Sequence, residues 1–361
     1  MKVTDPKKGE IAWINWVKIF CILFIYLNHS EIYCHSFLTY RTVYLPFFVN
    51  TFFIISGYLF YKSYTSPAPT NTSSIMENGK GKKLINNILF KLIIPSIIFS
   101  AINFFPKKVL RGEGIIVSDF LHDTVLGGSM WFTNALAIAE LLLLVMLLLV
   151  KPRKLYFLIY STTLALLSYL IYQSDTVFAE EAIPMFYKSG MSATLLMTLG
   201  GFYLYYEDQV DHWAKKWRFS QTFLPFYFFT FLTCILLLGY IYCCIRFFDY
   251  YSGALDQEPL NVTGILFIIA SALLVITLCK QLPSTKFANY WGRHTIGLYF
   301  FCGAIPNVSA MILSKFMVPS VTMVLICTLL SLLLGYIIVY LLNRFVPWIF
   351  DLRVLRNNKC H

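Results

Sequence analysis

Long apolar runs separated by short polar segments make up most of this chain of 361 residues. A helix that crosses a bilayer needs about 20 mostly apolar residues, and the runs are close to that length. We therefore predict an all-α membrane protein, a single bundle of about ten transmembrane helices that forms one domain over residues 1–361. The predicted helices cover about residues 11–30, 44–62, 84–104, 129–150, 155–173, 189–206, 221–246, 260–279, 294–314 and 318–343.

The polar segments between the runs predict the topology. If the N-terminus is cytoplasmic, 21 of the 29 Lys and Arg residues lie on the cytoplasmic side and 7 on the other side. Cytoplasmic loops of membrane proteins carry an excess of these residues, so we place both termini in the cytoplasm. Residues 66–83 are of low complexity and are predicted to be a flexible polar loop. Three histidines, His35, His122 and His212, fall in predicted loops.

The composition agrees with a membrane protein. The chain is 58% hydrophobic and 13% charged, whereas soluble domains carry about 25% charged residues. Its net charge of +11 is explained by topology first, so we expect no nucleic-acid partner, and an anionic cytoplasmic ligand is the less economical explanation. The nine cysteines lie mostly inside apolar runs without any CxxC spacing, so we predict no metal site.

Two ionisable residues, Lys18 and His29, stand in the first apolar run. They are eleven residues apart, which is three helical turns plus about 20°, so they share one face at a separation of about 16 Å. An ionisable group inside a membrane indicates a functional site, and this stripe suggests a pathway for a ligand. In the alternative interpretation, Lys18 only extends to the inner surface and His29 only lies in the outer interface.

Other runs contain polar residues that have both a structural and a functional interpretation. Lys83 and Lys91 precede Pro95 at the start of the third run, where they could bind phosphates or only anchor the helix. Glu140, at mid-depth in the fourth run, could be a structural partner of Lys18 or Lys91, or could line a cavity. We prefer the structural role for Glu140.

Glycines mark two further places in the chain. Gly57, between Ser56 and Tyr58, would let a neighbouring backbone approach closely. Gly292, three residues before Thr295, resembles a turn that leads into the ninth helix, so we predict a helix start there.

Taken together, these features resemble the integral-membrane acyltransferases of the acyltransferase-3 type, which include sugar O-acetylases. The first helix of that family carries a basic residue, ten further residues and then His, and this is its most specific motif. Asn15 stands where the family commonly has an acid, and Cys302 where many members have His. The positions that match the family are Lys18 and His29; Phe52, Phe53, Ser56, Gly57 and Tyr58; Lys91 and Pro95; Trp131 and Phe132; and Gly292, Thr295 and Tyr299.

The resemblance implies a multi-pass protein of the bacterial cytoplasmic membrane that transfers an acetyl (acyl) group from acyl-CoA to a carbohydrate hydroxyl. The acceptor would be a surface polysaccharide or its precursor, and acetyl-CoA would be a donor substrate, with no bound cofactor. His29 would be the general base, because a neutral imidazole can take the proton of an attacking hydroxyl. The predicted residues for binding the donor are Lys18, Lys91, Lys83, Ser56, Tyr58, Trp131, Arg293 and Tyr299.

A second class of function also fits the ionisable residues. A polytopic secondary transporter or flippase could use Lys18, His29 and Glu140 as an intramembrane polar relay. Such folds often have broken helices at matched positions of two halves, and we find no such symmetry in the sequence.

The predicted topology can be tested with two matched threonines. It places residue 72 in the cytoplasm and residue 176 outside, so in intact cells an impermeant thiol reagent should label a Thr176→Cys variant and spare a Thr72→Cys variant. The reverse pattern of labelling would show that the orientation is wrong. Labelling after permeabilisation is the control that both cysteines are reactive.

Overall fold

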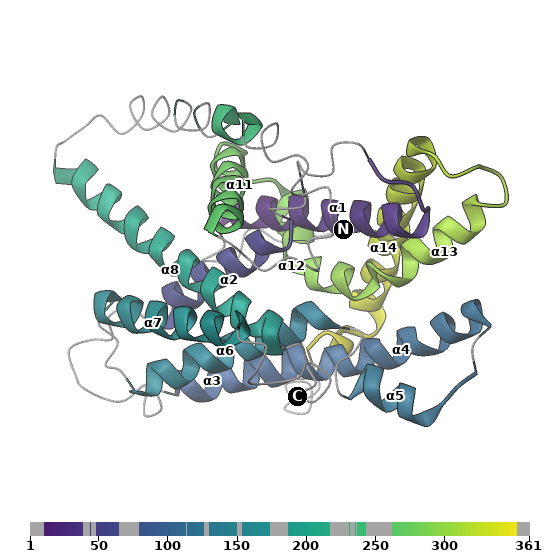
Figure 1. Ribbon diagram of the computed structural model, residues 1–361, viewed down its shortest axis with the longest axis horizontal. Helices are drawn as coiled ribbons and strands as arrows, with labels where there is room; N and C mark the ends of the chain where they lie inside the picture. The colour runs from purple at the N-terminus through teal and green to yellow at the C-terminus, as the bar shows by residue number, and fades with distance from the viewer. Residues whose placement is uncertain are drawn as a thin grey trace. The chain divides into compact units, whose positions relative to one another are not determined.

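The computed structural model describes residues 11–38, 44, 48–64, 79–112, 114–125, 130–149, 154–173, 187–216, 231, 235, 237–242 and 262–351. All regular structure in these ranges is helical, which confirms the predicted all-α class (Figure 1). The helices are α1 (Ala12–Tyr33), α2 (Asn50–Tyr64), α3 (Lys80–Asn87), η2 (Ile88–Ile93), α4 (Ile94–Arg111), α5 (Val117–Thr124), α6 (Trp131–Leu149), α7 (Lys154–Gln173), α8 (Tyr187–Lys216), α11 (Val262–Lys280), α12 (Lys286–Phe301), α13 (Ala304–Leu313), α14 (Val321–Phe345) and η4 (Pro347–Ile349).

Within the described residues, four helical stretches are long and apolar enough to cross a membrane: Ala12–Tyr33, Gly81–Val109, Trp131–Leu149 and Val321–Phe345. A fifth is possible if α12 and α13 together form one broken span. These five agree with predicted runs, whereas the full number of ten and the orientation of the termini stay predictions. The seventh run, residues 221–246, falls largely outside the described residues, as does most of the predicted loop 66–83, although α3 already begins at Lys80.

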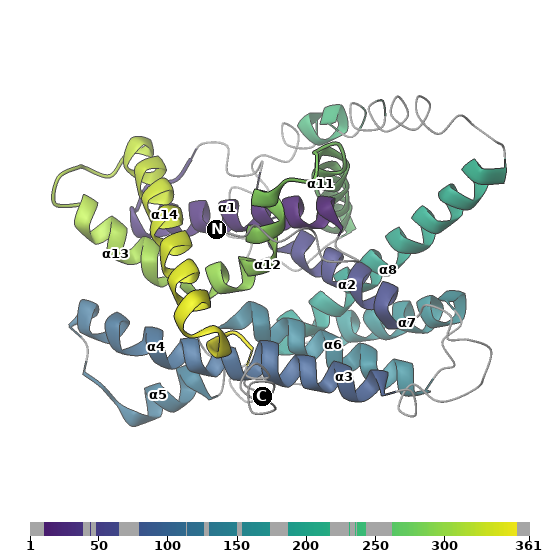
Figure 2. The same cartoon turned by 180° about the vertical axis from the view of Figure 1, so that it is seen from behind.

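The chain divides into two compact units, and each is described by itself. The first unit comprises residues 1–52 and 208–339, and the second comprises residues 53–207 and 340–361. In the first unit α1 packs on α11, α12 and α13. In the second unit α3, η2 and α4 follow one another and η2 packs on α6, while α5 folds back onto α4 (Figure 2). The single domain predicted over the whole chain stays a prediction.

The ninth predicted helix differs from the prediction at both ends. Helix α12 begins at Lys286, eight residues before the predicted start, because the Thr285 side chain caps it by accepting the backbone N–H of Ala288 at 3.1 Å. Gly292 therefore lies inside the helix and does not start it. The predicted continuous run is also broken after Phe301, where α12 ends and the axis turns by 65° into α13. The sequence signals for this break are Gly303 and Pro306.

The third predicted helix contains a wide turn that the sequence analysis did not predict. Residues Ile88–Ile93 form a π-helix that includes Lys91 and runs directly into α4, where Pro95 stands in the first turn. Pro95 has no N–H to donate to the carbonyl of Lys91 four residues before it, so a regular α-turn cannot close there. The Ser96 hydroxyl donates to the carbonyl of Leu92 at 2.6 Å. Such π-turns are frequent at functional sites.

Gly57 has the role that was predicted for it. In the second unit α2 crosses α8 so closely that a Cβ on Gly57 would overlap the backbone carbonyl of Met197. Gly200 on α8 makes the matching approach, since a Cβ there would overlap the carbonyl of Ile54. Small residues at such crossings let two membrane helices pack backbone against backbone.

The α2–α8 crossing predicts the effect of adding one methyl group. Gly57→Ala should destabilise the fold by about 1–3 kcal/mol, because two backbones must move apart to admit the Cβ. Gly239, also helical, has open space around its Cβ position and gives a matched control, so Gly239→Ala should leave stability unchanged or slightly raised. Thermal unfolding of both variants in detergent measures this, and equal melting temperatures would contradict the close crossing.

Candidate functional site

The first unit places α1 beside α12, and the two helices run in the same direction. Near their starts the Trp16 indole Nε1–H donates to the carbonyl of Pro283 at 2.9 Å. Further along, the Tyr26 hydroxyl donates to the carbonyl of Leu298 at 3.0 Å. Two parallel helices that both cross a membrane require an odd number of crossings between them, and the seven runs predicted between the first and the ninth satisfy this.

A buried amide pair fixes the contact between these helices. The Asn15 Nδ2–H donates to Asn289 Oδ1 at 3.2 Å, and Asn289 Nδ2–H donates to Ser284 Oγ at 3.3 Å. Asn15 and Asn289 are both buried, and Gly292 leaves the space that the Asn15 side chain occupies. Polar side chains at helix contacts in membranes hydrogen-bond across the interface because lipid offers no partner. Asn15, one turn before Lys18, therefore belongs to the packing of α1 on α12.

Lys18 and His29 lie on the side of α1 that packs on α12. Both belong to one uninterrupted helix, and at about 100° per residue each lies within about 60° of Asn15 around the helix axis. Ile22 and Ile25 on this side are buried, while Lys18 and His29 are half-buried. The imidazole of His29 stacks on the ring of Tyr33, with centroids 6.1 Å apart. The shared face predicted for Lys18 and His29 therefore exists within a single continuous helix.

The two predicted site residues of α12 belong to the same helix pair. Tyr299 comes seven residues after Gly292, so it projects from the face of α12 that meets α1. Tyr299 is buried, and Arg293 is half-buried next to Gly292. The first unit thus holds four of the predicted residues, namely Lys18, His29, Arg293 and Tyr299, on two helices in direct contact.

An acidic residue that the sequence analysis did not select lies at the end of α1. The Glu31 carboxylate is fully buried, accepts the backbone N–H of Leu38 at 2.9 Å and accepts a hydrogen bond from the Tyr44 hydroxyl. Glu31 is two residues after His29, so the two side chains leave α1 in nearly opposite directions. Glu31 therefore ties down the segment that follows α1, and its position at the end of an apolar run was the available signal.

The second unit contains the other predicted residues. Lys83 lies on α3 and Lys91 on η2, and both side chains are exposed. Within this unit the charges of Lys91 and Glu140 on α6 interact, and the structural role of Glu140 stays a prediction. A further contact joins this region to the start of α6, where the hydroxyl oxygens of Ser96 and Thr133 lie 2.6 Å apart, within hydrogen-bond distance.

The remaining predicted residues of the second unit lie on α2 and α6. The Tyr58 hydroxyl donates to Glu207 Oε2 at 2.7 Å, and the Lys62 ammonium lies 5.6 Å from the centre of the Tyr58 ring. Ser56 is half-buried on the same helix. Trp131 is the first residue of α6, and its ring packs edge-on against Phe132 at 6.2 Å. The polar atom of Tyr58 is thus already held by an acid, which the sequence did not reveal.

A comparison with protein-family models identifies the class of this protein. The model for the acyltransferase domain of the acyltransferase-3 type matches residues 11–340. The chain therefore belongs to the acyltransferase-3 family, as the sequence motifs indicated, and is a membrane acyltransferase by its family and its apolar helices. No curated protein and no solved structure gives a significant match.

The amide pair of Asn15 and Asn289 predicts how α1 responds to substitution. Asn15→Leu should destabilise the fold by about 1–3 kcal/mol, because it leaves the buried Asn289 oxygen without its donor. Asn15→Asp should cost less, since the Asn289 amide can turn and donate to the carboxylate while Ser284 donates to the amide oxygen. Thermal unfolding in detergent compares the two variants, and an Asn15→Leu variant as stable as the parent would contradict the role of the pair.

Proposed function

We propose that this protein is an O-acyltransferase that moves an acetyl group from acetyl-CoA to a hydroxyl of a carbohydrate, such as a surface polysaccharide or its precursor. The observation that carries the proposal is the stripe of Lys18 and His29 on one face of α1, packed on the helix that carries Arg293 and Tyr299. Membership of the acyltransferase-3 family supports the class of reaction. The donor, the acceptor and the base are the parts that the proposal adds.

In the proposed reaction His29 acts as the general base. Its neutral imidazole takes the proton of the acceptor hydroxyl while the hydroxyl oxygen attacks the thioester carbonyl. The C–S bond then breaks, the acyl group stays on the acceptor oxygen, and the proton passes to the thiolate of CoA. His29 is four residues before the end of α1, about 6 Å along the axis, so an acceptor can approach it from that end.

The donor would be held at the opposite end of the stripe. Lys18 is about 16 Å from His29 along α1, a separation that suits a ligand with anionic phosphates at one end and a thioester at the other. Lys83 and Lys91, which are exposed in the second unit, are further candidates for binding phosphate. Lys91 would then interact with two anionic groups, a phosphate of the donor and the carboxylate of Glu140.

The test measures donor binding and acyl transfer separately in the full-length protein. Acetyl-CoA binding is titrated on purified protein, and transfer is read by mass spectrometry of the glycans of a deletion strain that expresses each variant. His29→Ala and His29→Gln should lose about 100-fold or more of transfer and still bind acetyl-CoA, which is the usual effect of removing a positioned base. His35→Ala is the matched control, because His35 is exposed just beyond the end of α1.

Donor binding should depend on the lysines. Lys18→Ala and Lys91→Ala should weaken acetyl-CoA binding more than they slow transfer at saturating donor, whereas Lys18→Arg and the exposed Lys62→Ala should bind normally. Near-normal transfer by a folded His29→Ala variant would exclude His29 as the base. An acetyl group found on His29 after incubation with the donor alone would replace direct transfer by a covalent route.

A further inference from the structure

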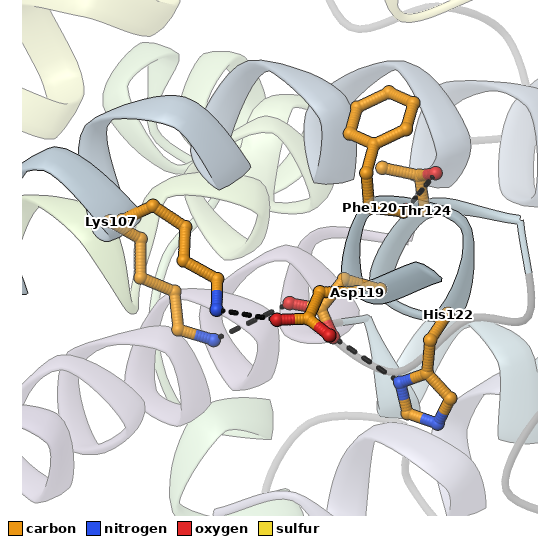
Figure 3. A network of polar contacts seen from close by, with 7 residues as sticks. Lys107, Asp119, Phe120, His122 and Thr124 are labelled. Atoms are coloured by element: carbon orange, nitrogen blue, oxygen red, sulfur yellow. Dashed lines mark hydrogen bonds and ion pairs between the residues drawn. The ribbon is translucent and has the colours of Figure 1, made fainter. Parts of the chain in front are cut away.

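The short helix α5 is joined to the end of α4 by two ion pairs and an aromatic cluster. Lys108 Nζ donates to Asp119 Oδ2 at 2.8 Å, and Lys107 Nζ lies 3.7 Å from Asp123 Oδ2 (Figure 3). The hydrogen bond from Lys108 holds the pKa of the Asp119 carboxyl below its ordinary value. The ring of Phe120 packs between Phe104 and Phe105, with centroids 5.2 and 5.8 Å away.

These contacts place α5 beside the last turns of a candidate membrane helix. The helical stretch Gly81–Val109, which contains α4, is long and apolar enough to cross a membrane, and Phe104 and Phe105 lie near its end. Because Phe120 contacts both rings, the middle of α5 lies at the depth of the last turns of a membrane helix.

Helix α5 presents a row of apolar side chains that nothing in its own unit covers among the described residues. Val117, Leu121 and Val125 recur every four residues, and the first two are 71% and 48% exposed. Ser118 and His122 are exposed further around the helix, and Asp119 is nearly opposite Leu121. The helix is therefore amphipathic, with separate apolar, packed and polar sides.

The apolar row continues an exposed apolar surface of α4. Helix α4 exposes Ile102, Phe105 and Val109 on one side of the apolar stretch. Ile115 and Ile116, which lead into α5, are exposed as well. The ammonium groups of Lys107 and Lys108 are paired with the carboxylates of Asp123 and Asp119 on α5. Each lysine charge is therefore compensated, which lowers the cost of placing it close to lipid.

We infer that α5 is an interfacial helix, with Val117, Leu121 and Val125 inserted among the lipids of the leaflet in which α4 ends. An amphipathic helix in this position lies in the plane of the membrane with its apolar side about 5–10 Å below the headgroups. Helix α5 thus gives the end of α4 a fixed depth in the bilayer.

The experiment reads the environment of single positions on α5 in the full chain. A fluorescent non-natural amino acid replaces residue 121, or residue 122 as the matched control, and the protein is reconstituted in phosphatidylcholine vesicles. Leu121 is on the apolar row and His122 is about 100° away from it. The label at 121 should be quenched by brominated acyl chains, and its quenching by aqueous iodide should be about threefold or more weaker than at 122.

Two results would overturn the inference. Equal quenching by iodide at 121 and 122 would show that the apolar row faces water. Protection of 121 from iodide without quenching by brominated lipid would show that a protein surface, such as a second copy of the chain, covers the row. If the 121 variant does not fold, the same label at 125, in the last exposed position of the row, gives the same comparison with 122.

Discussion

The requirement that polar groups find partners inside an apolar medium determines how the first unit is built. Asn15 on α1 and Asn289 on α12 satisfy one another, and the Tyr26 hydroxyl finds the carbonyl of Leu298. Each bond fixes which helix lies beside α1 and how α1 is rotated about its own axis. If α1 were rotated differently, the same polar groups would be buried without partners. The side on which Lys18 and His29 project is therefore set by packing and not by those two residues.

The sequence predicted what depends on the chain alone. The length of the apolar runs gave the membrane helices, because the bilayer imposes that length, and the spacing of Lys18 and His29 gave their common face. The predicted start of α12 near Gly292 was wrong because Thr285 caps the helix earlier. Gly292 instead leaves space for the side chain of Asn15, a contact across 277 positions of sequence. Helix α5 was missed because its eight residues are too few for a clear periodic signal.

For the candidate site, the sequence named residues whose roles stay predictions, and it did not reveal the contacts that these residues make. It singled out Glu140 as an acid that could pair with Lys18 or Lys91, and within the second unit the charge of Lys91 does interact with Glu140. It selected Tyr58 for the donor, which stays a prediction, and it gave no sign that the Tyr58 hydroxyl donates to Glu207. The π-helix at Lys91 likewise depends on Pro95 and on the packing of this segment on α6. Pro95 can be read from the local sequence, but the packing on α6 cannot.

The pairing of Asn15 with Asn289 has a consequence for how the protein is made. The two residues are 274 positions apart, and a ribosome adds about 5–20 residues per second. Roughly 14–55 s therefore pass between the synthesis of the first membrane helix and the synthesis of the helix that hydrogen-bonds to its Asn15 side chain. During that interval Asn15, Lys18 and His29 face either lipid or temporary neighbours, so this helix depends on the insertion machinery or on provisional contacts until its permanent partner arrives.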